Sequence, residues 1–434
     1  MLHATGQQLM HQASDSRPAA LFIAPIMPSD RGNGLAMRAG FFLSAYAKRF
    51  AVDLAVIPIA GATRGFGSFP TQHVQRSIIL PVTSMDTHFL LVSAVAEAKA
   101  RLTAFREYAR PSIIARLTAN IQSTLTAFAG DTNYRLVHVS RLYLAGLARP
   151  WMGAVNSGRP SLVLDCDEDD VNAYRRLAHV YRNSGRGERA AWAEAEAQAF
   201  KKLAGEWLHR FDLVLASSAD EARVLASRGK NVATTVVPNV ITRSPECKRL
   251  GRKGGYREII FVGNMSYLPN IDAAKWFALH ILPRVRRASP FPVRFFIAGD
   301  NPPSDITDLA RHPGIEVAGR FDDLSLLYRR ASLAVVPIRA GGGTRIKLIE
   351  AARYGVPVVA TRFGASGTGF RSGHELLLAD IERDFASSCV RVLTDDRLAS
   401  RLAASARKRA LREFDADSCS VRLLGKIERL SDRK

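Results

Sequence analysis

The sequence predicts a two-domain α/β protein in which each domain is a doubly wound parallel sheet covered by helices. The chain has 434 residues, more than a single domain usually contains. Short apolar runs alternate with longer polar or helical segments along both halves, as parallel sheets with crossover helices require. Hydrophobic residues make up 47% and charged residues 23%, an ordinary globular composition. No stretch approaches the ~20 apolar residues of a membrane-spanning helix.

The strand-like runs fall into two similar sets. Those of the first half are 21–25, 52–58, 77–80, 136–139, 161–165 and 213–217. Those of the second half are 259–262, 293–298, 315–318, 333–336, 356–360 and 376–379. Prolines and glycines interrupt the pattern between the sets, so we expect domains over 1–240 and 257–410 with a linker over 241–256. Ligands bind at the carboxyl ends of parallel strands, so two facing domains would form one cleft.

Composition also limits the location and the partners. The four cysteines show no paired spacing, which predicts reduced thiols and no structural metal. The first 17 residues lack the features of an export signal, so we expect a cytoplasmic protein. The net charge of +21 calls for an acidic partner. The densest basic runs, 175–189 and 248–257, contain no interleaved aromatic platform, which disfavours nucleic acid, whereas an anionic membrane surface remains a candidate.

A glycine-rich turn in the second half is the strongest candidate site. It follows the strand at 333–336 and contains Gly341, Gly342 and Gly343. Glycines let backbone amides approach a ligand closely. Thr344 is the predicted N-cap of a helix over 345–354, and Gly355 is its predicted C-terminal cap. The free N–H groups and the helix dipole would then favour an anion at the glycines.

The first turn of that helix carries two cations and then a carboxylate. Arg345 and Lys347 oppose the helix dipole unless an anion is bound, and a diphosphate would resolve that conflict. Glu350 shares a helix face with Lys347 and can accept hydrogen bonds from a ribose diol. The alternative is a local salt pair between Lys347 and Glu350, worth about 0.2–0.5 kcal/mol, which would leave the three glycines unexplained.

Three features of the first half are weaker candidates. Gly34 closes a glycine turn after the first strand, where it would contact donor phosphate or acceptor, or only improve packing. His138 ends the strand at 136–139 and is either a site residue or a packed strand histidine. The acidic run 165–170 could be a metal clamp, but we expect it to cap the following helix and expect no metal. The apolar stripe of Trp192, Phe200, Leu203 and Trp207 is interpreted as core.

The segment 341–350, with the Gly-Val-Pro-Val-Val run at 355–359, resembles the nucleotide-sugar signature of GT-B glycosyltransferases, most closely the retaining family four. The segment 259–277 is similar to the first strand, glycine turn and helix of that family's donor domain, with Gly263 in the turn. The resemblance covers about 255–425 strongly and the first half loosely. It implies two Rossmann-like domains facing across a cleft, and a last helix over 411–434 that returns to the first domain.

The resemblance also implies roles for single residues. Arg345 and Lys347 would stabilise the leaving diphosphate, and Glu350 would hold the ribose. The glycine turns and Thr344 would bind the donor, and His138 would face its sugar. The chain departs from the family's usual pattern at Gly342, Asn264 and Ser140, which replace a glutamate, a frequent arginine and a second histidine.

The resemblance therefore implies a retaining glycosyltransferase with a nucleotide-diphosphate sugar as co-substrate and no metal or other cofactor. Its acceptor would be a glycan or a lipid-linked molecule, in cell-surface or extracellular polysaccharide biosynthesis. The enzyme would be cytoplasmic and peripheral on the inner face of the cytoplasmic membrane. Two alternatives stay open: a nucleotide-sugar epimerase of the same fold, and a non-catalytic anion-binding scaffold on a degenerate transferase fold.

Overall fold

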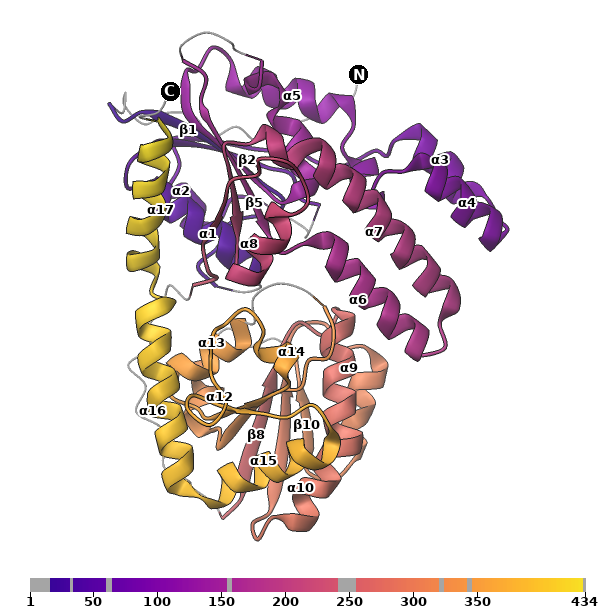
Figure 1. Cartoon of the computed structure of the whole chain (residues 1–434), viewed down its shortest axis with the longest axis vertical. Helices are drawn as coiled ribbons and strands as arrows, with labels where there is room; N and C mark the ends of the chain where they lie inside the picture. The colour runs from indigo at the N-terminus through magenta and orange to yellow at the C-terminus, as the bar shows by residue number, and fades with distance from the viewer. Residues whose placement is uncertain are drawn as a thin grey trace. The chain divides into compact units, whose positions relative to one another are not determined.

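The computed structural model describes residues 16–31, 34–59, 65–153, 158–240, 255–319, 324–341 and 346–431 (Figure 1). The chain divides into two compact units. The first unit combines Met1–Val240 with Ala416–Lys434, and the second is the continuous segment Ile241–Asp415. No helix in the described ranges has the length and apolar character needed to cross a membrane.

The first unit is built on a seven-stranded parallel sheet with the order β3-β2-β1-β4-β5-β6-β7. Its strands are β1 (Ala19–Ala24), β2 (Ala51–Val56), β3 (Arg76–Ile79), β4 (Tyr134–Ser140), β5 (Ser161–Asp167), β6 (Leu213–Ala216) and β7 (Thr234–Val236). The order reverses between β1 and β4, the position where open α/β sheets bind ligands.

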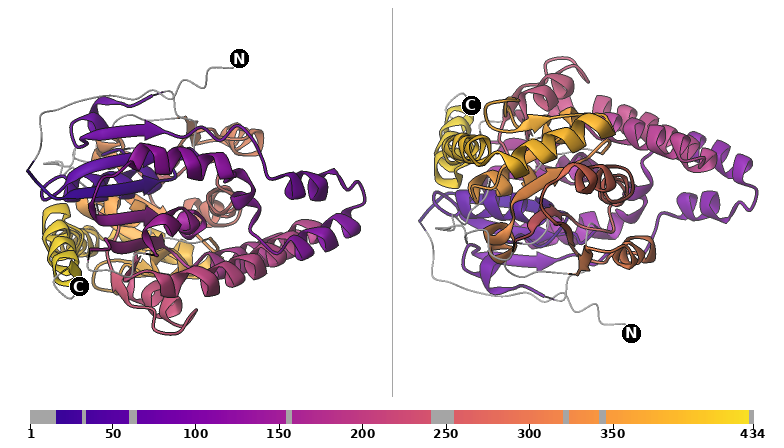
Figure 2. Two further views of the ribbon diagram at one scale, coloured as in Figure 1. Left: turned by 90° about the horizontal axis from the view of Figure 1, so that it is seen from above. Right: turned by 90° about the horizontal axis from the view of Figure 1, so that it is seen from below.

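Helices cover both faces of this sheet. They are α1 (Gly34–Tyr46), α2 (Ser68–Thr71), α3 (Thr87–Ala94), α4 (Ala98–Tyr108), η1 (Ser112–Arg116), α5 (Ala119–Ala129), η2 (Leu142–Trp151), α6 (Asp170–Asn183), α7 (Gly187–Trp207), η3 (Leu208–Arg210), α8 (Ala219–Ala226) and α17 (Ala416–Ser431). One face packs under α1 and α17, and the other under α5, η2 and α7. Successive strand residues alternate between these two cores, as the period of two requires. Helices α3 and α4 project away from the sheet of this unit (Figures 1 and 2).

The second unit contains a six-stranded parallel sheet with the order β10-β9-β8-β11-β12-β13. Its strands are β8 (Arg257–Val262), β9 (Val293–Ala298), β10 (Ile315–Ala318), β11 (Leu333–Val336), β12 (Val358–Ala360) and β13 (Leu377–Leu378). Its helices are α9 (Leu268–Trp276), η4 (Phe277–Ile281), α10 (Leu282–Ala288), α11 (Ser304–Thr307), η5 (Asp308–Arg311), α12 (Ser325–Arg330), α13 (Ile346–Arg353), α14 (Arg362–Ala365), α15 (Glu382–Thr394) and α16 (Asp396–Glu413). The prediction of two doubly wound parallel sheets is confirmed.

The last two helices belong to different units: α16 to the second and α17 to the first. Helix α16 packs on α13 of the second unit, and only two residues, Phe414 and Asp415, separate it from α17. Helix α17 then packs against α1 and places Cys419, Leu423, Leu424 and Ile427 in the core of the first unit. The last helix therefore completes a hydrophobic face that the first 240 residues leave open.

Candidate functional site

The predicted donor residues lie around α13, but four of them fall outside the described residues. These are Gly342, Gly343, Thr344 and Arg345. Their assigned roles stay predictions. In the second unit the described members are Gly263, Gly341, Lys347 and Glu350.

Lys347 connects α13 to the turn that follows β8. Its Nζ donates a hydrogen bond to Asn270 Oδ1 over 2.5 Å and lies 4.8 Å from the ring centroid of Phe261. Asn270 Nδ2 in turn donates to the carbonyl oxygen of Asn264 over 2.8 Å. The ammonium group is therefore held at the carboxyl end of β8, where the peptide turns from strand to helix.

Little space is left beside position 263. A Cβ on Gly263 would lie 2.9 Å from Asn270 Nδ2 and 3.1 Å from Lys347 Nζ, closer than side chains normally approach. The predicted glycine turn and the predicted cation are thus brought together. Asn270 was not predicted as a site residue; its only signal in the sequence is its position in the first helical turn after the glycine.

Gly341 marks a second close approach in this unit. Its φ is +106°, and a Cβ would lie 2.7 Å from the Tyr267 hydroxyl and 3.0 Å from Pro269 Cγ. The loop after β11 therefore packs directly on the loop after β8. Parallel neighbours β8 and β11 end at the same edge of the sheet, so both glycine turns and the start of α13 converge there.

Glu350 lies one turn further along α13 in a half-buried position. Its Oε2 accepts a hydrogen bond from the Tyr328 hydroxyl over 3.3 Å, and the Tyr328 ring stacks on Tyr354. Burial raises the pKa of Glu350 to about 7, although the Tyr328 hydrogen bond and the Lys347 charge oppose the shift. Near neutral pH this carboxyl group is therefore poised to ionise when hydrogen-bond donors approach it.

In the first unit, Gly34 is the first residue of α1, directly after two residues outside the described ranges. His138 lies deeper, with no exposed surface, because α1 covers the face to which this residue of β4 points. Its Nδ1 lies 2.5 Å from the Tyr46 hydroxyl, and its ring packs against Phe22 and Phe42. Burial, with a smaller effect from Arg38, lowers the pKa of His138 well below its ordinary value. The enclosed ring has the surroundings of a packed strand histidine, and the catalytic role of His138 stays a prediction.

The acidic run at the end of β5 is engaged by arginines. Arg38 of α1 donates to both Asp165 oxygens, over 2.8 and 2.6 Å, and both side chains are buried. Arg228 contacts Asp169, which also caps α6, and Arg141 contacts Asp170 over 2.8 Å. Each of these three carboxylates therefore pairs with an arginine. Arg38 was not predicted, although one charge in an otherwise apolar helix is a signal of a buried pair.

Part of the second unit matches a known family. Residues 256–395 match the family described as glycosyl transferases group 1. The match spans about a third of the chain, all of it within the second unit. Within it lie Gly263, Asn270, Lys347 and Glu350, so the matched glycosyltransferase segment contains the converging turns described above.

One curated protein is similar to this chain over 140 residues. It is an uncharacterized 44.6 kDa protein in the cps region of Klebsiella pneumoniae, 25% identical over 140 residues. The match covers 30% of this chain and 36% of that protein, so the chain aligns with about a third of the length of its curated relative.

Solved structures resemble the whole chain. Sucrose-phosphate synthase from Thermosynechococcus elongatus is 16% identical, with coverage of 96% of this chain and 100% of that chain and a TM-score of 0.64. Anabaena HepE in complex with UDP-glucose is 15% identical, with coverage of 95% and 100% and a TM-score of 0.61. TarM from S. aureus is 10% identical, with coverage of 94% and 98% and a TM-score of 0.63. At these identities the likeness establishes a shared fold, the GT-B fold.

Proposed function

We propose that this protein is a glycosyltransferase that moves a sugar from a nucleotide-diphosphate donor to a glycan or lipid-linked acceptor. The observation that carries the proposal is the position of Lys347, held by Asn270 beside the Gly263 turn at the carboxyl end of β8. A fixed cation beside two glycine turns suits a diphosphate. The solved complex of HepE with UDP-glucose is consistent with such a donor on this fold.

The chemistry follows from where charge develops. As the bond between the sugar and the diphosphate breaks, negative charge grows on the leaving oxygens. Lys347, together with Arg345, would stabilise that charge, because preorganised cations and amides act most strongly on the transition state. Glu350 would accept hydrogen bonds from the ribose hydroxyls. Retention of anomeric configuration is proposed from the resemblance to family four.

The cellular role is proposed from two further observations. The cps-region location of the Klebsiella relative favours cell-surface polysaccharide synthesis. The net charge of +21 and the exposed Leu90 and Leu91 on the projecting helix α3 favour a peripheral site on an anionic membrane surface.

The test is a donor panel with matched variants. Purified wild type, Lys347→Ala and Lys275→Ala are incubated with nucleotide sugars, with and without a membrane lipid extract. Nucleoside diphosphate release and the sugar product are measured by mass spectrometry. Lys347→Ala should lose roughly 10- to 100-fold of the activity, the value of a charged hydrogen bond. Lys275→Ala should match wild type, because Lys275 pairs with Asp305 at the surface of α9.

The alternatives give different results. Conversion of the donor sugar without any acceptor would indicate the epimerase. If wild type neither binds nor turns over any donor of the panel, the protein is a scaffold and the proposal is overturned.

A further inference from the structure

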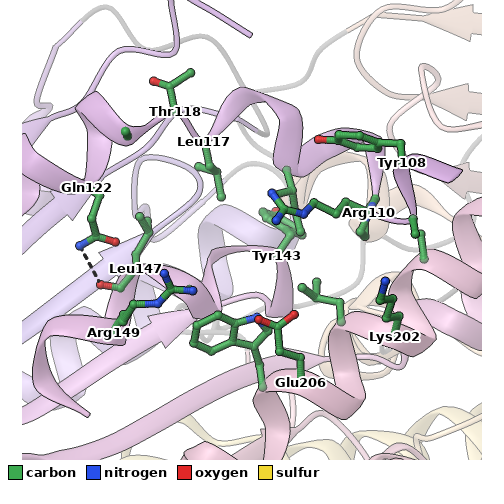
Figure 3. A pocket seen from close by; sticks show the side chains of 18 of the residues that line it. Tyr108, Arg110, Leu117, Thr118, Gln122, Tyr143, Leu147, Arg149, Lys202 and Glu206 are labelled. Carbon is green, nitrogen blue, oxygen red and sulfur yellow. Dashed lines mark hydrogen bonds between the residues drawn. The ribbon is translucent and has the colours of Figure 1, made fainter. Parts of the chain in front are cut away.

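The first unit contains a cavity that the donor chemistry does not use. It lies between the C-terminal end of α4, η1, α5, η2 and the second half of α7 (Figure 3). Its volume is about 680 Å³, within the range of small-molecule sites. It is far larger than the gaps left by ordinary packing of a protein interior.

The walls of the cavity are mainly apolar. Leu117 comes from the segment before α5, Leu147 from η2, and Leu203 and Trp207 from α7. The last two belong to the stripe that the sequence predicts to be core. They are buried and join the core on one side, but they also line the cavity on the other. A hydrocarbon chain placed there would remove apolar surface from water on both partners.

The rim of the cavity is basic. Arg110, Arg149 and Lys202 line it, all three are exposed, and none forms an ion pair with the described part of the chain. The Arg149 guanidinium lies 5.5 Å from the Trp207 ring centroid, which orients it beside the opening. Glu206 is the single carboxylate among the lining residues, so the rim keeps a positive excess.

A buried hydroxyl group without a partner also lines the cavity. Tyr108 is only 7% exposed, and its hydroxyl forms no hydrogen bond within the described residues. Burial raises the pKa of Tyr108 to about 12, so the group stays protonated and can donate. Leaving a buried donor unsatisfied is unfavourable, and a polar ligand atom would remove that cost.

We propose that this cavity binds the hydrocarbon chain of an anionic amphiphile whose phosphate lies at the basic rim. Leu117, Leu147, Leu203 and Trp207 would contact the chain, and Arg110, Arg149 and Lys202 would contact the phosphate. The same chemistry fits a membrane phospholipid and a lipid-phosphate acceptor. Binding itself does not depend on glycosyl transfer, whereas the assignment of this amphiphile as the acceptor rests on the proposed function.

The experiment uses alkyl phosphates below their micelle concentration and calorimetry on the full chain. We expect dodecyl phosphate to bind, with affinity that rises about fourfold for each added methylene between hexyl and decyl chains. Inorganic phosphate and dodecyl maltoside should bind at least tenfold more weakly. Lys202→Glu should weaken dodecyl phosphate binding at least tenfold. Lys201→Glu should stay within twofold of wild type, because Lys201 is exposed on the same helix but does not line the cavity.

Nucleoside diphosphate affinity, measured on the same samples, serves as the folding control and separates the two proposals. Two results would overturn the lipid site while nucleotide binding stays normal: alkyl phosphate affinity that does not depend on chain length, or dodecyl phosphate affinity that Lys202→Glu does not lower. Either result would leave the proposed glycosyl transfer standing. Competition between dodecyl phosphate and the active fraction of the lipid extract would identify the occupant as the acceptor. Binding without competition would identify it as a membrane lipid.

Discussion

At the scale of single residues, Glu350 and His138 show how burial sets the charge of a side chain. Both are withdrawn from water, and each is shifted toward its neutral form. The Glu350 carboxyl group is close enough to Lys347 on α13 for that charge to oppose the shift. His138 is enclosed by aromatic rings in the first unit. Ionisation of Glu350 is therefore within reach at neutral pH, whereas His138 stays uncharged.

Nucleotide binding should depend on pH through Glu350. Ribose hydroxyls donate hydrogen bonds to the ionised carboxylate, so nucleoside diphosphate affinity should rise from pH 6 to pH 8, by up to about tenfold per unit below the pKa of about 7. Glu350→Gln should lose this dependence, and exposed Glu316→Gln should retain it. The ligand's own titration is common to all three proteins. Parallel pH profiles for wild type and Glu350→Gln would refute the role of Glu350 at the ribose.

The Arg38 and Asp165 pair gives a prediction for stability. Asp165→Asn leaves Arg38 buried with much of its charge uncompensated, which should cost about 3–5 kcal/mol of unfolding free energy. Arg182→Met removes one partner of an exposed pair with Glu194 and should cost less than about 1 kcal/mol. Urea denaturation of both variants measures the difference. Equal midpoints would mean that the buried pair contributes no more than a surface pair.

At the scale of elements, the strands were predictable because buried parallel strands are continuous apolar runs. The glycine turn after β11 was predictable because Gly341 has a φ of +106° and a Cβ there would lie 2.7 Å from the Tyr267 hydroxyl. Strand β7 was missed because three residues at a sheet edge carry almost no pattern. The complete burial of His138 could not be predicted, because the alternation of residues along a strand does not say which face of the sheet a helix covers. The cavity was missed because its walls come from segments far apart in sequence.

Helix α17 gives the prediction at this scale. Leu423 is 1% exposed and packs under α1, whereas Val421 on the same helix is 71% exposed. Leu423→Ala should lower the unfolding free energy by about 2–5 kcal/mol through lost burial and the cavity left behind. Val421→Ala should change it by less than about 0.5 kcal/mol. Thermal or urea unfolding of the two variants tests the packing of α17, and similar losses would contradict it.

At the scale of the whole molecule, the net charge of +21 creates a positive electrostatic potential that comes from the sum of many charges and not from any single ion pair. Much of it lies on exposed arginines, so it acts on partners in solution and is screened by salt. The exposed leucines of α3 add an apolar component that salt does not screen. Membrane attraction should therefore have two separable parts.

Vesicle binding separates these parts. The protein should bind anionic vesicles more tightly than zwitterionic ones, and binding should fall steeply between about 0.05 and 0.5 M salt. Leu91→Ser, which changes a side chain that is 66% exposed on α3, should reduce the salt-resistant fraction. Leu326→Ser, a comparable exposed change on α12, should not. Co-sedimentation measures both, and equal binding to the two vesicle types would exclude an electrostatic contribution.

The place of α17 in the first unit has a consequence for folding during translation. The second unit is a continuous segment, so it can be complete as soon as Asp415 has emerged. The first unit is translated earlier, but it needs Leu423, Leu424 and Ile427 from the last helix to close the hydrophobic face beneath α1. The order of synthesis and the order of completion are therefore reversed, and the nascent first unit keeps an uncovered apolar surface until α17 has emerged.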